Sequence, residues 1–427
     1  MKTKLVIFGI TGDLSSRKLL PALSKIIATG GFEDLSIIGV SRRHVEQYQV
    51  LGDHNEQLGG TTSMFTMDLS NPDDYGRLRD YVNLQDDEQL LFYLSVPPDS
   101  AAEIVELLGT AGLNGKNVKL LLEKPFGTTL ESAKDMITHV AEYFDESQVY
   151  RIDHYLAKEM AQNILTFRGR NALFAHVWNN SVIERVDVIA LEAIDIEGRA
   201  QFYEQTGALR DVLQGHLLQL LSLVLLRIPD NMDWSKLSAA RLDALNHVLP
   251  ATTDKTVRAQ YNGYRSEVEN TDSQTETFVS VGLQSDDPLW QGVPLALTTG
   301  KALDRKVTEV RVHFRKTNEA QSNFLIFRIQ PNEGIEIDLV TKKPGYDREF
   351  ETQQLHFTYP EGTRLPDAYE QVIVDAIESR KSLFASGDEV LRAWEIVAPL
   401  QQAWAQTSED LRFYDHGAKA KTIIEQS

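Results

Sequence analysis

A short segment around His154 carries several groups that could bind or activate a substrate. It reads RIDHYLAKE from residue 151 to 159. His154 and Lys158 are four residues apart, so on a helix they would share one face. Near the first turn of that helix they would join its free N–H groups in binding a phosphate. The same spacing is also common on solvated helices, so the segment alone indicates a phosphate site without establishing one.

A second candidate, His216, lies in an apolar stretch that we predict to be one long helix over 207–226. The aliphatic residues on its side of that helix are Leu209, Val212, Leu213 and Leu220. A histidine in such a setting is usually a packed core residue. The alternative is a general base whose tautomer and pKa are set by a neighbouring carboxylate. Asp153 could be that carboxylate, whereas Asp211 would lie about 140° away around an α-helix.

A glycine-containing turn, GITGDL over residues 9–14, joins a predicted strand at 5–8 to a predicted helix at 14–28. Glycine lets the backbone approach a pyrophosphate closely, and a helix N-terminus supplies free N–H groups. The spacing falls short of the full G-x-G-x-x-G pattern. A plain strand–helix turn would therefore explain the motif as well.

The end of the second predicted strand, at 36–40, carries Arg42 and Arg43 and no acid. A dinucleotide without a 2′-phosphate usually meets an Asp or Glu at this position, whereas an arginine suits the 2′-phosphate. The two arginines therefore favour NADP over NAD, although a solvated basic turn would have the same sequence.

Lys124 lies in the run EKPFG, just past a predicted strand at 118–123. Ligands bind at the carboxyl ends of the strands in doubly wound folds, so Lys124 could contact substrate or cofactor. A turn made by the proline and the glycine, with Lys124 in solvent, is the simpler interpretation.

Strands and helices alternate over the first 150 residues. Beyond the elements above, this part contains a predicted strand at 89–96 and predicted helices at 101–111 and 130–144. The alternation predicts a Rossmann-like, doubly wound parallel sheet, an α/β arrangement. We expect residues 1–152 to form this dinucleotide-binding domain.

The pattern changes after about residue 150. The further predicted elements are helices at 155–168, 366–384 and 388–405 and strands at 185–195, 308–315, 323–330 and 334–341. They predict an α+β domain over 153–427, with a large, mainly antiparallel sheet packed by helices. Residues 251–290 are polar and irregular, and we expect them to be a surface excursion.

Composition narrows the classes of partner and site. The 427-residue chain has a formal net charge of −19, which repels nucleic acid and anionic membranes. It has no cysteine, which excludes disulfides and Cys-ligated metals. The longest apolar run, 217–226, is far shorter than the ~20 residues of a membrane helix. The N-terminus shows no signal-peptide pattern, so a cytoplasmic location is expected.

Taken together, these segments resemble the glucose-6-phosphate dehydrogenase family. The matching runs are FGITGDLSSRKLLPAL, FYLSVPP, LLEKPFG, YRIDHYLAKE, ALRDVLQGHLLQLL, TGKAL, and DAYEQVIVDAI followed by FASGDEVLRAWEIVAPLQQAW. They occur in the family's order and span nearly the whole chain. The combination of RIDHYL, EKPFG and R-D-x-x-Q-x-H is highly specific, so it outweighs the simpler interpretation of each motif by itself.

The resemblance implies oxidation of D-glucose 6-phosphate at C1 to 6-phospho-D-glucono-1,5-lactone with hydride transfer to NADP, the first step of the oxidative pentose phosphate pathway. It makes His216 the catalytic base and Asp153 its partner carboxylate. The implied substrate-binding residues are Lys124, His154, Tyr155, Lys158, Glu192, Asp211, Lys301 and Lys306. The implied cofactor-binding residues are Gly9, Thr11, Gly12, Asp13, Leu14, Lys18, Arg42, Arg43 and Lys124. It implies no metal, and it implies a homodimer formed through the second domain.

The chain also departs from the family's pattern. Gly215 replaces an asparagine beside the base, Ala157 a glycine, and Thr298 an arginine, and residues 417–419 replace a Ser-Trp-Gly-Pro tail. The chain is short, with little between the second and third predicted strands. Two alternatives stay open: the same chemistry on another sugar phosphate or with NAD preferred, and a non-catalytic regulatory relative.

Overall fold

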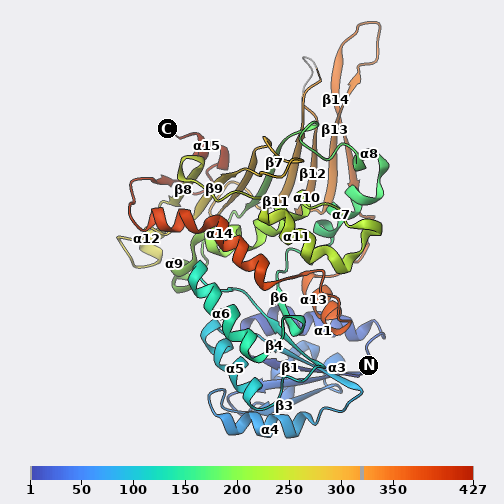
Figure 1. Cartoon of the computed structure of the whole chain (residues 1–427), viewed down its shortest axis with the longest axis vertical. Coiled ribbons are helices and arrows are strands. Elements are labelled where there is room, and N and C mark those ends of the chain that lie inside the picture. The colour runs from blue at the N-terminus through green and yellow to red at the C-terminus, as the bar shows by residue number, and fades with distance from the viewer. Residues whose placement is uncertain (1, 318–321, 427) are drawn as a thin grey trace. The chain divides into compact units, whose positions relative to one another are not determined.

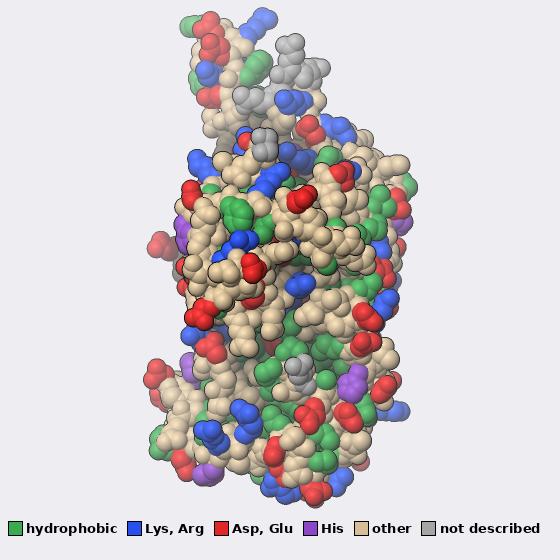
Figure 2. All heavy atoms as spheres, turned by 90° about the vertical axis from the view of Figure 1, so that its left-hand side faces the viewer, with side chains coloured by type: hydrophobic (Ala, Val, Ile, Leu, Met, Phe, Trp, Pro, Cys, Tyr) green, Lys and Arg blue, Asp and Glu red, His purple; other side chains and the backbone are tan. Residues whose placement is uncertain are grey.

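The computed structural model describes residues 2–317 and 322–426. By its internal contacts the chain divides into two compact units, Met1–Ala157 with Pro366–Val390 and Lys158–Leu365 with Leu391–Ser427. This grouping differs from the expected division at residue 152, because a C-terminal helical segment packs on the first unit. On the face drawn in Figure 2, acidic and basic side chains are interspersed.

The first unit is built on a seven-stranded sheet in the order β15-β6-β5-β4-β1-β2-β3 (Figure 1). Its strands are β1 (Lys2–Phe8), β2 (Leu35–Ser41), β3 (Thr62–Thr66), β4 (Glu88–Leu94), β5 (Val118–Leu122), β6 (Val149–Ile152) and β15 (Phe384–Ala385). Every pair is parallel except the short β15–β6 pair. The direction of strand order reverses between β1 and β4, which creates the switch point where doubly wound sheets bind ligands.

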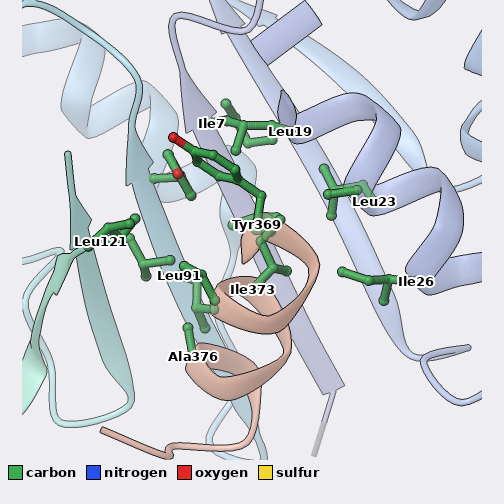
Figure 3. Packing of buried hydrophobic residues seen from close by; sticks show 14 of the residues in the cluster. Ile7, Leu19, Leu23, Ile26, Leu91, Leu121, Tyr369, Ile373 and Ala376 are labelled. Atoms are coloured by element: carbon green, nitrogen blue, oxygen red, sulfur yellow. The ribbon is translucent and has the colours of Figure 1, made fainter. Parts of the chain in front are cut away.

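Helices cover both faces of this sheet because its strands are apolar on both sides. They are η1 (Ser15–Leu19), α1 (Leu20–Ala28), α2 (Gln47–Leu51), η2 (Gly52–His54), α3 (Asn55–Leu58), α4 (Pro72–Val82), α5 (Pro98–Thr110), α6 (Leu130–Tyr143), η3 (Glu146–Gln148) and α13 (Ala368–Ile377). On one face, Ile7 packs with residues of α1 and α13 (Figure 3). On the other, Phe8 stacks on Tyr75 of α4 with 6.4 Å between ring centroids. The interval after β2, expected to hold little, contains β3 and α4.

The second unit is built on a nine-stranded sheet in the order β14-β13-β12-β11-β7-β10-β9-β8-β16. Its strands are β7 (Ile183–Leu191), β8 (Thr256–Tyr261), β9 (Phe278–Leu283), β10 (Leu295–Gly300), β11 (Val307–Phe314), β12 (Phe324–Gln330), β13 (Gly334–Lys342), β14 (Phe350–Thr358) and β16 (Leu411–Tyr414). Only the β10–β7 and β16–β8 pairs are parallel. The predicted fold class, a parallel sheet followed by a mainly antiparallel one, is confirmed.

The prediction of a surface excursion over 251–290 is wrong. This stretch supplies β8 and β9, which lie inside the sheet order. Its polar residues misled the prediction because several of them are buried and paired. The Gln260 side chain, for example, is 1% exposed and donates to the Thr275 carbonyl at 2.8 Å.

Helices of the second unit are α7 (Glu159–Arg170), α8 (Ala172–Ala175), α9 (Ala200–Ala208), η4 (Leu209–Leu217), α10 (Leu218–Leu225), η5 (Asp230–Met232), η6 (Trp234–Lys236), α11 (Leu237–Asn246), η7 (Thr253–Lys255), α12 (Tyr264–Glu267) and α15 (Ala420–Glu425), and α14 (Gly387–Trp404) continues from the first unit. The predicted helix over 207–226 is confirmed from Leu209 to Leu225, and a kink at Gly207, whose φ is 61°, separates it from α9. Its first half is the π-helix η4 rather than an α-helix, and its second half is α10. Within the described ranges, no helix is both long enough and apolar enough to cross a membrane.

Candidate active site

The glycine turn after β1 is shaped so that only glycine fits at its first position. Gly9 has a φ of 79°, and a Cβ there would lie 2.2 Å from the Ser95 carbonyl oxygen. The Gly12 N–H and the Ser15 hydroxyl both donate to the Gly9 carbonyl at 2.9 Å. The turn therefore brings bare backbone to the switch point between β1 and β4, which fits the close approach of a pyrophosphate. Ser15 and Ser95 were not found from the sequence.

The other residues of the expected cofactor set surround this turn. Thr11, Asp13 and Lys18 are exposed, whereas Leu14 packs against the apolar core. The Asp13 carboxylate pairs with Arg17 at 2.7 Å. The exposed members are therefore accessible to a ligand, whereas Leu14 anchors the start of the helix.

Arg42 and Arg43 follow β2, which pairs in parallel with β1. Both side chains are exposed. The Ser41 hydroxyl shapes this bend, because it donates to the Arg43 carbonyl at 2.8 Å and accepts from the Arg43 N–H at 3.3 Å. Two cationic side chains therefore lie beside the glycine turn at the same edge of the sheet.

An acidic cluster forms where β4, β5 and β6 end. The Tyr93 hydroxyl donates to the Glu123 carboxylate. The pKa of Glu123 is raised to about 7, chiefly because the group is buried; the Asp153 charge also raises this pKa, whereas the hydrogen bond from Tyr93 and the charge of Lys124 lower it. The expected residues Lys124 and Asp153 are therefore both close to Glu123. Glu123 belongs to the EKPFG run, but the sequence assigned no role to it.

Asp153 and His154, in the segment after β6, are both in contact with neighbouring groups. Asp153 is buried and accepts a hydrogen bond from the Tyr155 N–H at 2.9 Å. The His154 ring stacks on Tyr369 of α13, with centroids 6.1 Å apart and planes 16° apart. It is tilted against Tyr155 at 4.9 Å. Figure 3 shows Tyr369 extending from α13 toward Ile7. Sequence analysis missed Tyr369, although it lies in the matched run DAYEQVIVDAI.

The prediction that His154 and Lys158 share a helical face is wrong. The helix α7 begins at Glu159, Lys158 is its N-cap with an extended ψ of 135°, and His154 lies in the preceding turn. Lys158 belongs to the second unit, where its charge lowers the pKa of Glu333 against the larger raising effect of burial. Lys158 therefore lies at a helix N-terminus, a position that suits an anion.

The prediction that Asp211 points 140° away from His216 is also wrong, because η4 is a π-helix. Hydrogen bonds in a π-helix run from residue i to i+5, so residues five apart lie about one turn above each other. Asp211 and His216 are therefore on the same side of η4. His216 is 6% exposed, and Leu209 and Leu213 of the same helix are also buried.

Glu276 fixes the start of this π-helix. Its carboxylate accepts a hydrogen bond from the Leu209 N–H at 2.9 Å, and its carbonyl accepts one from the Ala208 N–H at 2.9 Å. Burial raises the pKa of this carboxyl. Gly207 leaves room for it, since a Cβ at that position would lie 2.5 Å from Glu276 Oε1. The register of Asp211 and His216 thus depends on Gly207 and Glu276.

Three of the expected sugar-binding residues lie together in the second unit. The Lys301 ammonium pairs with the Glu192 carboxylate and lies 5.3 Å from the centre of the Tyr203 ring. Burial raises the pKa of Tyr203, and among the nearby charges that raise it further the largest effect comes from Asp211. Glu192, Asp211 and Lys301 therefore all lie near Tyr203. Lys306, expected in the same set, is exposed just before β11.

One departure from the family pattern has a clear structural setting. Thr298 is buried in β10, and its hydroxyl is 2.9 Å from the Ser280 hydroxyl of the paired strand β9.

Asp153 and His216 belong to different units. Their pairing as carboxylate and base therefore stays a prediction.

Comparison with known proteins identifies relatives of both parts of the chain. Residues 6–163 match the family "Glucose-6-phosphate dehydrogenase, NAD binding domain", and residues 165–426 match "Glucose-6-phosphate dehydrogenase, C-terminal domain". The chain is 33% identical to glucose-6-phosphate 1-dehydrogenase of Chlamydia muridarum, over 94% of this chain and 90% of that protein. A solved glucose-6-phosphate dehydrogenase in complex with its substrate glucose-6-phosphate is 28% identical with a TM-score of 0.92, covering 98% of this chain and 95% of that one. The glucose-6-phosphate 1-dehydrogenase structure from Mycobacterium avium is 30% identical with a TM-score of 0.87, covering 98% and 94%.

Proposed function

The chain belongs to the glucose-6-phosphate dehydrogenase family, and from this premise we propose that it oxidises D-glucose 6-phosphate at C1 to 6-phospho-D-glucono-1,5-lactone with NADP. The observation that carries the proposal is the π-helix η4. It places Asp211 and His216 on one side, and Asp211 in turn lies near Tyr203, against which the Lys301 ammonium packs. An imidazole and groups that bind hydroxyls are the parts that oxidation of a sugar requires.

NADP fits the residues present in the first unit. A Cβ would fill the space at Gly9, and two exposed arginines follow β2. Gly9, Thr11, Gly12, Asp13, Leu14 and Lys18 would hold the dinucleotide, and Arg42 with Arg43 would bind its 2′-phosphate. When bound, the nicotinamide supplies the hydride acceptor.

The remaining residues bind and activate the sugar. We assign the phosphate clamp to His154, Tyr155 and Lys158. The hydroxyl contacts are assigned to Lys124, Glu192, Asp211, Lys301 and Lys306. His216 accepts the proton of the C1 hydroxyl as the hydride leaves C1, and Asp153 stabilises the imidazolium that forms. Hydrogen bonds from the clamp to a charged phosphate are stronger than hydrogen bonds between neutral groups, so the clamp favours a phosphorylated sugar over the free sugar.

Further parts of the proposal concern organisation. Residues 1–152 would act as the dinucleotide-binding domain and 153–427 as the substrate-binding and dimerisation domain of a cytoplasmic homodimer. One relative, from Arabidopsis thaliana, carries the word cytoplasmic in its name and is 32% identical. Size measurement in solution tests the dimer, because a monomeric mass at assay concentrations contradicts it.

A substrate panel tests the reaction. The purified protein is assayed for cofactor reduction with glucose 6-phosphate, free glucose and other hexose phosphates, each with NADP and with NAD. We expect glucose 6-phosphate with NADP to give the highest kcat/KM. Equal rates with glucose and glucose 6-phosphate would contradict the phosphate clamp. Binding of both ligands without any turnover would instead support a regulatory relative.

A further inference from the structure

Tyr203, a residue of α9 without an assigned role, lies directly beside the expected sugar site. It is 2% exposed and belongs to an apolar cluster of the second unit that includes Tyr264 and Phe278. Its ring faces the Lys301 ammonium at 5.3 Å from the centroid. A cation within about 6 Å of an aromatic face is attracted by the negative charge of that face.

Lys301 needs such a partner because its ammonium is removed from water. Its side chain is 3% exposed, whereas that of its ion-pair partner Glu192 is 36% exposed. The Lys301 backbone is also fixed, since its N–H donates to the Thr277 carbonyl at 2.9 Å and its carbonyl accepts from the Tyr414 hydroxyl at 2.7 Å. The Lys301 ammonium is thus buried, whereas the Glu192 carboxylate that pairs with it is partly exposed to solvent.

This asymmetry matters when a sugar binds. If the Glu192 carboxylate accepts a hydrogen bond from a sugar hydroxyl, it shares its charge between the sugar and Lys301. A buried ammonium with a weakened partner is costly. The Tyr203 ring is not changed by that exchange, because it is buried and packed edge-to-face on Tyr264 with centroids 6.2 Å apart.

We propose that Tyr203 is a positioning residue for sugar recognition, whose ring holds the Lys301 ammonium in place so that Lys301 donates to one sugar hydroxyl while Glu192 accepts from another. The proposal rests on the proposed function, since that function makes Lys301 and Glu192 sugar ligands. It predicts that loss of the ring weakens binding of the sugar phosphate, and that binding of NADP is spared.

The test compares three variants by steady-state kinetics. Tyr203→Leu removes the ring, and a contact of this type, when desolvated, corresponds to a change of ~5- to 30-fold. We expect the KM for glucose 6-phosphate to rise by about that factor, with the KM for NADP nearly unchanged. Tyr203→Phe keeps the ring and should recover most of the loss. Tyr261→Leu is the matched control, because it truncates an equally buried tyrosine of the same cluster and leaves both the Tyr203 ring and the Tyr264 ring on which it packs.

Two kinetic outcomes would overturn the proposal. If Tyr261→Leu raises the KM for the sugar phosphate as much as Tyr203→Leu does, the effect is one of packing. If Tyr203→Phe is as impaired as Tyr203→Leu, the hydroxyl rather than the ring is responsible.

A double-mutant cycle on unfolding separates this proposal from the proposed function. Tyr203→Leu, Lys301→Met and the double variant are unfolded in urea without substrate. We expect the ring and the ammonium to be coupled by ~5- to 30-fold in the unfolding equilibrium constant. Additive effects would overturn the ring–ammonium contact itself. Coupling in a protein that fails to oxidise glucose 6-phosphate would refute the proposed function and leave the contact standing.

Discussion

Replacement of Gly207 by alanine is expected to disrupt the start of the π-helix that carries Asp211 and His216. Gly207 has a φ of 61° and a ψ of 179°, a backbone conformation that only glycine adopts readily. The new Cβ would also lie 2.5 Å from Oε1 and 2.9 Å from Oε2 of Glu276. The Glu276 carboxylate must therefore move away from the Leu209 N–H.

The cost follows from two separate effects. Backbone strain in this region is worth ~1–3 kcal/mol. Losing the hydrogen bond between the Leu209 N–H and the buried Glu276 carboxylate, which spans 2.9 Å, costs ~1.5–3 kcal/mol more. The total of about 2.5 to 6 kcal/mol is a large part of the ~5–15 kcal/mol by which a protein is stable.

Urea unfolding of the wild type, Gly207→Ala and Gly198→Ala measures this cost. Gly198 has a similar φ of 75°, but a Cβ there meets nothing within 4 Å. That control therefore reports strain alone, and the difference between the variants reports displacement of Glu276. We expect Gly207→Ala to be the less stable variant and to lose kcat as well. Equal destabilisation of the two variants would refute the reasoning about Glu276.

Three further predictions concern Glu123, His216 and Arg42. Glu123 has a pKa raised by burial from its ordinary 4.5 to about 7, so the folded state binds this proton more tightly than the unfolded state. The stabilisation that this proton gives is full below about pH 4.5 and is lost as pH rises through 7. In urea titrations, the unfolding free energy of the wild type relative to Glu123→Gln should therefore fall by up to about 3 kcal/mol between pH 4.5 and pH 8. A difference that stays constant over this range contradicts the prediction. His216→Ala should lower kcat ~100- to 10,000-fold while equilibrium binding of the sugar phosphate persists, and an unchanged rate refutes its role as base. Arg42→Ala should raise the Kd of NADP far more than that of NAD in fluorescence titrations, and equal losses would mean that Arg42 does not bind the 2′-phosphate.

The local sequence of the first unit contained most of what was needed to predict its fold. Apolar runs such as 5–8 and 118–123 become buried strands because both faces of a parallel sheet are covered by helices. Gly9 was recognisable because the turn between a strand and a helix at the switch point requires it. In each of these elements, the residues that predict the local structure lie within a few consecutive positions.

Polar strands of the second unit could not be predicted in the same way. Residues such as Gln260 and Thr298 look suited to a surface, yet in the structure they are buried and bonded to groups from other segments. Whether a buried polar group is acceptable depends on its partner, and that partner is distant in sequence. The stretch 251–290 was therefore misread as an excursion.

The amino-acid sequence by itself determined the chemistry available to this protein: His216, the carboxylates, the lysines and the glycine turn are fixed by residue type and order. Only the tertiary structure decided how they are arranged. The π-helical register puts Asp211 and His216 on one side, because Glu276, from the distant loop before β9, holds the start of that helix. Long-range packing chooses between α- and π-helical periods whose local signals are alike, so spacing along the chain could not predict the direction of each side chain.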